Sequence, residues 1–391
     1  MFSLPPTPED PVFALNRLFT SDPSPLKISC GIGAYRDNSG NPTVLSCVKK
    51  AKEIIGAESQ NEYLPIAGDA EFLRLSRELC FGDGSDLSNV ESIQSLSGTG
   101  GLYLSLKLLK KLGCKKVYAS NPTWGNHKSL TLNAGLEYST YTYLDLSNLK
   151  TPEIDFKNLI QDLEGMQKGE GVILQACGHN PTGVDPSEGE WEEIVEVCGR
   201  KGLYVILDNA YQGFASGSPS SDSLSIRKFL SSSLDFLVCC SYAKNFGLYG
   251  QRVGAVHVVS SESKNVVDAM KQIARATYSN PPKYGSDIVK TVLGSSELRE
   301  DWISEVGEMS SRIKSMRLAI REKLEEKTGT SWKHVTDQIG MFSYTGLSKE
   351  QVMKCREESV YMLDSGRISV AGVNEGNLER ICEVIGKAVE E

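Results

Sequence analysis

One lysine of the chain, Lys244, stands in a setting that could make its amine reactive. It follows an apolar run, residues 236–240, that has the length of a buried strand. Desolvation lowers the pKa of a lysine toward the range in which the free amine attacks a carbonyl. Arg252, which follows a glycine-rich turn, would lower that pKa further and could also hold a phosphate. The pair suggests a Schiff-base lysine beside a phosphate anchor, although a lysine seen alone is more often a solvated surface charge.

A second possible phosphate site lies earlier in the chain. The strand-like residues 93–96 run into the sequence SGTGG, and an amphipathic helix pattern follows. A strand, a glycine turn and a helix start present free backbone N–H groups to an anion, and Ser97 and Thr99 add hydroxyl donors. Tyr103 occupies the position of the third glycine in a dinucleotide fingerprint, which excludes that motif. A phosphate cradle is therefore favoured over a plain turn.

Other polar or aromatic side chains also come directly after apolar strands. They are Trp124, Asn180, Asp208 and Tyr211. In a parallel sheet covered by helices, ligands bind at the carboxyl ends of the strands. Seen alone, Asp208 would be a cap or turn residue and Trp124 a core residue. Their recurrence at strand ends favours one shared site.

The elements that would position these residues alternate regularly, which predicts a parallel sheet with helices on both faces. We expect helices over residues 44–55, 70–79, 128–134, 156–166, 186–200, 264–274 and about 297–327, and strands over residues 93–96, 117–119, 137–144, 236–240 and 255–259. Shorter patterns after residue 327 predict a smaller α+β unit. Residues 1–25 carry six prolines and little periodicity, so we expect an extended arm that packs on a partner subunit or on the small domain.

The length and composition of the chain indicate how many domains it forms and exclude several classes of protein. A chain of 391 residues is expected to form two domains, or one large domain with an annex. The net charge of −8 and the lack of a basic block argue against nucleic acid, and no apolar run approaches the roughly 20 residues of a membrane helix. The start lacks the patterns of a signal peptide or a mitochondrial presequence, so a cytoplasmic protein is expected. Ten cysteines without a C-x-x-C pair, and only four histidines, predict reduced, buried thiols and no metal site.

Nine motifs, taken together and in order, closely resemble the aspartate aminotransferases, which are fold-type I, class I pyridoxal-phosphate enzymes. The motifs are NEYLPIAGDAEF, SLSGTGG, NPTWGNH, HNPTG, DNAYQGF, SYAKNFGLYGQRVG, ATYSNPP, GMFSYTGL and SGRISVAG. They run from about residue 33 to residue 372, which is nearly the whole chain. The resemblance implies a large α/β domain with a mostly parallel seven-stranded sheet between helices, and a smaller α+β domain. The implied division is residues 1–40 for the arm and part of the small domain, 41–305 for the large domain and 306–391 for the small C-terminal domain.

The resemblance also implies an activity. It is the reversible, ping-pong transfer of an amino group between L-aspartate and 2-oxoglutarate, giving oxaloacetate and L-glutamate, through a Schiff base of pyridoxal 5'-phosphate. The family further implies a homodimer with shared active sites. An aromatic or broad-specificity aminotransferase on the same scaffold is the nearest alternative. A non-catalytic regulator and a nicotinamide-dependent dehydrogenase rank far below, because the lysine is intact and the dinucleotide fingerprint is missing.

Three residues would be catalytic by this resemblance. Lys244 would form the Schiff base and shuttle a proton. Asp208 would pair with the pyridinium nitrogen, an interaction of roughly 4 kcal/mol at about 4 Å and an effective dielectric of about 20. Tyr211 and Asn180 would hydrogen-bond the phenolic oxygen of the cofactor. His179 would orient Asp208 from behind, with a core histidine whose hydrogen bonds are satisfied as the equal alternative.

The remaining site residues divide between cofactor and substrate. The phosphate would be held by Ser97, Gly98, Thr99, Ser241, Arg252 and, from the neighbouring subunit, Tyr63. The substrate would contact Gly33, Trp124, Asn180, Arg275 and Arg367, with Trp124 also stacked on the cofactor ring. Arg367 would grip the α-carboxylate, and Arg275 of the neighbouring subunit would grip the distal carboxylate. A guanidinium left unpaired beneath an apolar side chain would be penalised, so Arg275 favours dicarboxylic amino acids.

The chain departs from the family pattern at a few positions. Ala243 stands where a serine commonly precedes the lysine. Gln175 and Gly178 replace residues that are often His and Ala, and Asn209 stands where Ser is common. These departures bear on cofactor affinity or rate and not on the type of reaction.

Overall fold

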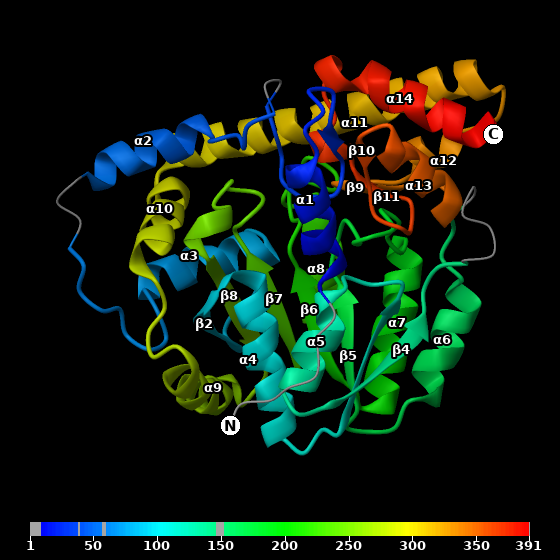
Figure 1. Ribbon diagram of the computed structural model, residues 1–391. Coiled ribbons are helices and arrows are strands. Elements are labelled where there is room, and N and C mark those ends of the chain that lie inside the picture. The colour runs from blue at the N-terminus through cyan, green and yellow to red at the C-terminus, as the bar shows by residue number, and fades with distance from the viewer. Residues whose placement is uncertain (1–8, 38–39, 57–59, 146–151, 391) are drawn as a thin grey trace, which may run out of the picture.

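A seven-stranded sheet forms the centre of the computed structural model, which describes residues 9–37, 40–56, 60–145 and 152–390 (Figure 1). Its strand order is β2-β8-β7-β6-β5-β3-β4. The strands are β2 (Val90–Leu96), β3 (Lys116–Asn121), β4 (Glu137–Thr142), β5 (Gly171–Gln175), β6 (Tyr204–Asn209), β7 (Phe236–Ser241) and β8 (Val253–Val259). Strands β7, β6, β5, β3 and β4 are parallel, whereas β8 is antiparallel to both of its neighbours. The predicted mostly parallel sheet is confirmed.

Helices cover both faces of this sheet, as the alternation of patterns predicted. In chain order, the helices of the described residues are α1 (Pro11–Ser21), α2 (Ser46–Ile55), α3 (Ala70–Phe81), α4 (Ser97–Lys111), α5 (Asn126–Asn133), α6 (Phe156–Gly165), α7 (Glu188–Lys201), α8 (Leu224–Leu230), α9 (Ser263–Thr277), α10 (Lys283–Gly294), α11 (Ser296–Thr328), α12 (Lys333–Asp337), α13 (Lys349–Glu357) and α14 (Glu375–Glu390). Short 3-10 turns occupy Ser221–Ser223, Tyr249–Gln251 and Val370–Gly372. Among these described helices none is both long and apolar enough to cross a bilayer.

The pleat of the strands divides the interior into two hydrophobic cores. Along β6, Val205 and Leu207 belong to one core and Ile206 to the other, because successive side chains of a strand point to opposite faces. Helices α4, α5 and α9 cover the second core, and α3, α6, α7 and α8 cover the first. Sheet residues buried on both faces therefore read as continuous apolar runs.

Local signals in the sequence fix several helix ends. Helix α7 begins after Ser187, whose hydroxyl accepts from the backbone N–H of Glu190 while the Glu190 carboxylate accepts from Ser187. This reciprocal pair is a capping box, and acidic residues in the first turn suit the helix dipole. Gly202 ends α7 in the left-handed conformation, which glycine adopts without steric cost.

A smaller α+β unit sits at one end of the large sheet. It contains the parallel pair β1 (Ile28–Ser29) and β10 (Val360–Tyr361), the antiparallel pair β9 (Phe342–Tyr344) and β11 (Arg367–Ser369), and helices α12 to α14. Helix α11 has 33 residues and runs over the top of the large sheet in Figure 1, with α14 packed beside its C-terminal half.

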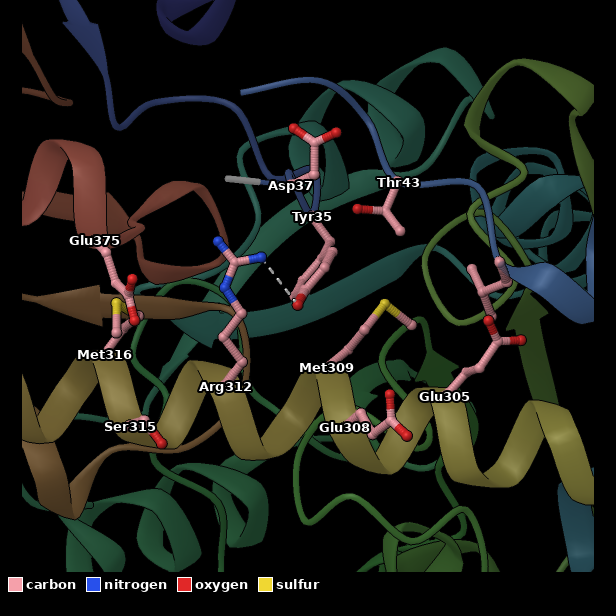
Figure 2. Close-up of a pocket in the computed structure, with 11 residues that line it drawn as sticks. Tyr35, Asp37, Thr43, Glu305, Glu308, Met309, Arg312, Ser315, Met316 and Glu375 are labelled. Atoms are coloured by element: carbon pink, nitrogen blue, oxygen red, sulfur yellow. Dashed lines mark hydrogen bonds between the residues drawn. The ribbon is translucent and has the colours of Figure 1, made fainter. Parts of the chain in front are cut away.

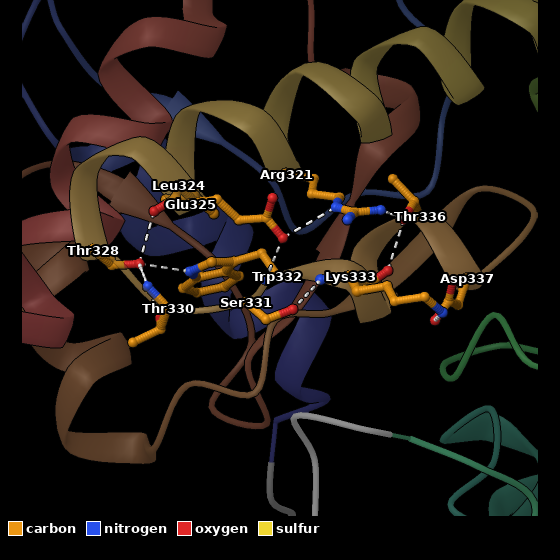
Figure 3. A network of polar contacts seen from close by, with 10 residues as sticks. All are labelled: Arg321, Leu324, Glu325, Thr328, Thr330, Ser331, Trp332, Lys333, Thr336 and Asp337. Carbon is orange, nitrogen blue, oxygen red and sulfur yellow. Dashed lines mark hydrogen bonds and ion pairs between the residues drawn. The ribbon is translucent and has the colours of Figure 1, made fainter.

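The C-terminal end of α11 is tied to the small unit by a polar network (Figure 3). Glu325 accepts from Arg321 Nε at 3.0 Å and from the backbone N–H of Trp332 at 2.9 Å. The indole of Trp332 donates to Thr328 Oγ1 at 2.9 Å, and Arg321 also donates to Thr336 Oγ1 at 3.1 Å. Segment 330–337 is therefore fixed against α11 by side-chain bonds.

The expected extended arm is wrong for its second half. Residues 1–8 lie outside the described residues, but α1 occupies Pro11–Ser21. The carboxylate of Asp10 accepts from the backbone N–H groups of Val12 and Phe13, and Pro11 stands at the first turn, where no N–H is needed. The prolines that suggested an arm thus include one that starts a helix.

Candidate active site

A cavity of about 400 Å³ lies at the carboxyl edge of the large sheet. Eleven predicted site residues line it: Gly33, Ser97, Gly98, Thr99, Trp124, Asn180, Asp208, Tyr211, Ser241, Lys244 and Arg252. Gly33 follows Ile28–Ser29 and Arg252 directly precedes β8, and the others come from the ends of β2, β3, β5, β6 and β7 or from the segments that follow these strands. The rule that ligands bind where parallel strands end therefore identified the correct edge.

Lys244 lies three residues beyond β7, with its amine facing an aromatic ring. Its Nζ is 4.8 Å from the centre of the Tyr211 ring. Burial lowers the pKa of Lys244, Asp208 opposes this, and Arg252 lowers the pKa further. Burial and Arg252 therefore change the pKa of Lys244 in the predicted direction. A lower pKa extends the pH range in which the amine is unprotonated.

The start of α4 forms a compact cradle with the end of β7. Ser97 Oγ is 2.8 Å from Ser241 Oγ, and a Cβ on Gly98 would lie 3.3 Å from Ser241 Cβ. Ser97 has a φ of 59° and Arg252 has a φ of 51°, so two non-glycine residues adopt the left-handed conformation here. Such backbone outliers occur mostly at functional sites. Hydroxyls, first-turn N–H groups and a guanidinium make this end suited to a phosphate.

Asp208 is held at the end of β6 by a histidine that sequence reasoning missed. The Nε2 of His127, a fully buried residue at the start of α5, is 3.1 Å from Asp208 Oδ2, and its Nδ1 is 2.8 Å from Thr123 Oγ1. The two contacts orient the carboxylate toward the cavity. A signal existed in the motif NPTWGNH, where Thr123 and His127 are four residues apart at a helix start.

The contact predicted between His179 and Asp208 is wrong. The Nε2 of His179 is 2.9 Å from Ser120 Oγ, and its Nδ1 is 2.8 Å from Thr182 Oγ1. The ring also stacks on Tyr143 with centres 4.0 Å apart. Because both ring nitrogens already have partners, His179 supports the turn after β5 and not the carboxylate.

Gln175, one of the departures from the family pattern, holds Asn180 in place. Its Nε2 donates to the Asn180 carbonyl at 2.8 Å, and its Oε1 accepts from the Asn180 N–H at 2.8 Å. The Asn180 amide in turn donates to the Tyr211 hydroxyl at 3.2 Å. Burial raises the pKa of Tyr211, so its hydroxyl is protonated. The departure at Gln175 thus provides a specific support for two site residues.

Arg367, from β11 of the small unit, reaches the Asn180 side of the site. Its Nη1 donates to Asn180 Oδ1 at 3.3 Å, and its Nη2 donates to the Gly31 carbonyl. The guanidinium lies over the Phe342 ring, 4.4 Å from its centre. The side chain is buried and its Nε has no hydrogen-bond partner among the described residues. A buried guanidinium with an open donor is suited to a carboxylate ligand.

Besides Arg367, two predicted site residues do not line this cavity. Tyr63 is 81% exposed, and Arg275 is exposed at the end of α9, where its Nη1 donates to Ser279 Oγ. Both side chains are surface groups of this chain. They are also the two residues expected to act in the neighbouring subunit.

The cavity has further lining residues that were not predicted as site residues: Phe13, Leu102, Gln175, Ala210, Ala243 and Tyr249. Tyr249 belongs to the glycine-rich turn after Lys244, and its hydroxyl accepts from the backbone N–H of Tyr35 at 3.0 Å. Arg312 of α11 donates to the Tyr35 hydroxyl at 3.2 Å (Figure 2). A second cavity, of about 760 Å³, lies around this contact, between α11 and the side chains of Tyr35, Asp37, Thr43 and Leu45. Tyr35 and Tyr249 therefore connect it to the wall of the site.

Comparison with known proteins identifies the relatives of the chain. The family model "Aminotransferase class I and II" matches residues 26–385. A mitochondrial aspartate aminotransferase of Arabidopsis thaliana is 42% identical over 393 residues, which cover 98% of this chain and 90% of the relative.

Solved structures agree with the sequence match. The cytoplasmic aspartate aminotransferase of Saccharomyces cerevisiae superposes with a TM-score of 0.94 and 38% identity, over 99% of this chain and 98% of that one. An aromatic-amino-acid aminotransferase of Burkholderia pseudomallei, covalently bound to pyridoxal phosphate, superposes with a TM-score of 0.94 and 37% identity. The superposition covers 99% of this chain and 98% of that one. With these matches over nearly its full length, the chain belongs to the class I and II aminotransferase family.

Proposed function

We propose that this protein is an aspartate aminotransferase that uses pyridoxal 5'-phosphate. It would transfer the amino group reversibly between L-aspartate and 2-oxoglutarate, giving oxaloacetate and L-glutamate. The observation that carries this proposal is the convergence of Lys244, Asp208 and Arg367 on one site, an amine of lowered pKa, a carboxylate and a buried guanidinium. The similarity to several aspartate aminotransferases at about 40% identity supports it.

The residues of the cavity fit this cofactor. Its phosphate matches the cradle of Ser97, Gly98, Thr99, Ser241 and Arg252, and its ring nitrogen matches Asp208. Trp124 would stack on the ring, with the Tyr211 hydroxyl and the Asn180 amide at its phenolic oxygen. When bound, the cofactor supplies an electron sink that makes the bond at the substrate Cα labile.

The side chains of the site would then hold the cofactor, orient one another and transfer protons. Lys244 would anchor the cofactor through its amine and, once free, carry a proton to and from the substrate Cα. Asp208 would keep the ring nitrogen protonated, with His127 fixing the direction of its carboxylate. Tyr211 would place its ring beside Lys244, in line with the 4.8 Å between the amine and the ring centre.

Two guanidinium groups would select the substrate. Arg367 would bind the α-carboxylate beside Asn180, Trp124 and Gly33, and Arg275 would bind the distal carboxylate. The open Nε of Arg367 supports the first assignment. Arg275 lies outside the cavity of its own chain, so its role requires a second subunit.

We further propose a homodimer whose active sites are shared, with Tyr63 and Arg275 crossing to the partner. The exposure of both side chains supports this arrangement. Mixing a Lys244→Ala chain with an Arg275→Ala chain tests it, because one site of each hybrid dimer would carry both native residues. Random pairing should restore about a quarter of the native activity. Independent sites in each chain would restore none.

The ratio of kcat/KM for aspartate and for phenylalanine tests the substrate class. We expect aspartate to be preferred by at least about 10²-fold, since a buried guanidinium without its carboxylate partner is penalised. The preference should shrink strongly in Arg275→Ala. Equal kcat/KM values would favour the aromatic or broad-specificity alternative, which the aromatic neighbour keeps as the second candidate.

The division into residues 1–40, 41–305 and 306–391 also stays a proposal, as does a cytoplasmic location. The boundary at residue 305 falls inside α11, so any movement between the units would involve this helix. Ten buried, free cysteines suit a reducing compartment. The relatives include both mitochondrial and cytoplasmic enzymes, so cell fractionation is the relevant measurement.

A further inference from the structure

Two cysteines and a histidine meet behind the phosphate cradle. Cys80 lies in the last turn of α3, Cys240 precedes Ser241 on β7, and His257 lies on β8. One donor atom from each lies within 4.8 Å of the others, and the two sulfur atoms are 3.4 Å apart. All three side chains are buried. This cluster could not be predicted from the sequence, because its members are far apart in the chain and form no C-x-x-C pair.

The neighbours of the cluster are arranged as the second shell of a metal site usually is. His257 Nδ1 is 2.8 Å from Ser92 Oγ, and its Nε2 is 3.0 Å from Ser76 Oγ. A hydrogen bond from Nδ1 to Ser92 leaves the Nε2 lone pair available as a ligand. The Asn209 amide lies 3.6 Å from Cys240 Sγ, in position to donate to a thiolate.

We propose that Cys80, Cys240 and His257 bind one zinc ion, with the hydroxyl of Ser76 as the fourth donor. Zinc–sulfur bonds of about 2.3 Å in a tetrahedral site place two sulfur atoms about 3.8 Å apart, so the observed pair needs only a small shift. Ser76 can give up its contact with His257, because its hydroxyl is also 2.5 Å from the Tyr242 hydroxyl.

Charge favours zinc over other thiol-binding ions. Two thiolates and one Zn²⁺ sum to zero with a neutral imidazole and hydroxyl, which limits the cost of placing ions in a buried site. Cu⁺ would leave a net negative charge there.

Burial also separates this proposal from a disulfide switch. Interior thiols are inert toward oxidants in solution, whereas a metal binds while the chain folds. The ion would join α3, β7 and β8 directly before Ser241 and so stiffen one wall of the phosphate cradle. Its expected role is structural.

The adjacent cysteine gives a matched control. Cys239 is equally buried on β7 but faces the other core, where its sulfur lies 3.3 Å from Ser105 Oγ on α4. The holoenzyme is produced in zinc-supplemented medium, and its metal content is measured by elemental mass spectrometry. We expect about one zinc per chain in the native protein and in Cys239→Ala, and at least about tenfold less in Cys80→Ala and in Cys240→Ala.

Growth with cobalt gives a second readout that does not depend on folded variants. Co²⁺ bound by two thiolates should give visible d–d bands at wavelengths beyond the absorption of the cofactor. Zinc below about a tenth of an ion per chain in the native protein, no such bands with cobalt, or a Cys80–Cys240 disulfide found by peptide mass spectrometry would each overturn the proposal. Equal zinc in Cys239→Ala and the two ligand variants would overturn it as well.

Discussion

The carboxyl edge of the large sheet and the small unit supply two sides of the candidate site by different means: the sheet edge lines the cavity, and Arg367 of the small unit contacts Asn180 in its wall. At the sheet edge, Asp208 near the end of β6 and Lys244 three residues beyond β7 line one cavity, because these two strands are parallel neighbours. In the small unit, Arg367 and Phe342 depend on a segment tied to α11 by buried guanidinium bonds. Arg317 of α11 donates to the carbonyls of Val335, Ile339, Gly340 and Phe342. Strand register therefore builds one half of the site, and cation–carbonyl contacts hold the other.

Replacing Arg367 tests the half contributed by the small unit and should have the largest effect. Arg367→Ala removes a buried group that has room for a carboxylate, at a cost of about 2–5 kcal/mol, or roughly 30- to 5,000-fold in kcat/KM. Both aspartate and glutamate should be affected, since both carry an α-carboxylate. Arg367→Lys should recover only part of the loss, because an ammonium cannot bind in a bidentate manner. A loss confined to dicarboxylic substrates would contradict this assignment.

Replacing Arg317 tests how the small unit is held. Arg317→Met leaves several buried carbonyls without a donor, so the free energy of unfolding should fall by roughly 2–4 kcal/mol. KM for aspartate should rise as well, because Phe342 and Arg367 lose their support. Arg321→Met is the control on the same helix, since that side chain is partly exposed (Figure 3), and its effect should be smaller. Similar denaturation curves for the two variants would refute the role given to Arg317.

Replacing His127 tests how Asp208 is held at the edge of the large sheet. His127→Asn removes the ring nitrogen that contacts Asp208, and a hydrogen bond to a charged group contributes about 1.5–3 kcal/mol. We expect kcat to fall by about tenfold or more with the fold intact. His179→Asn is the matched control, because its ring bonds Ser120 and Thr182. A larger loss of kcat in the His179 variant would restore the original expectation.

The smallest effect concerns the pKa of Lys244. Below its pKa the amine is protonated and cannot attack a carbonyl, so capture of an aldehyde by the apoenzyme should rise with pH through that value. Arg252→Ala removes one cause that lowers the pKa, and the midpoint should move to higher pH. Pyridoxal without phosphate is the probe, since loss of a phosphate contact cannot then explain the result. Arg275→Ala should leave the midpoint unchanged.

Much of the site could be predicted from the sequence, because its residues lie at the ends of apolar strands. Apolar runs with the right length located β5, β6 and β7, and the polar residues after them line one cavity. Helix α1 was not predicted because the prolines of residues 1–25 suggested an extended arm, although Asp10 and Pro11 form an ordinary helix start. The sequence pattern could not choose between His127 and His179, because both follow strands and only side-chain directions distinguish them.

Contacts between segments far apart in the chain could not be predicted from the sequence. Nothing in the sequence pairs Cys80 with Cys240, or Arg317 with the carbonyls around Phe342, since these contacts form only when helices pack on the sheet. Tyr63 and Arg275 show a different limit. Their expected partners belong to a second copy of the chain, which no pattern within one chain can place.

The absorption spectrum of the purified enzyme tests the central claim most directly. If Lys244 is the amine that anchors pyridoxal phosphate, the native protein should absorb in the near-ultraviolet and visible range, shift on addition of aspartate, and return on addition of 2-oxoglutarate. Lys244→Ala should lose the cycle and at least roughly 10²–10⁴-fold in kcat/KM. A colourless native protein that ignores the added cofactor, or a Lys244→Ala variant with normal turnover, would contradict the account.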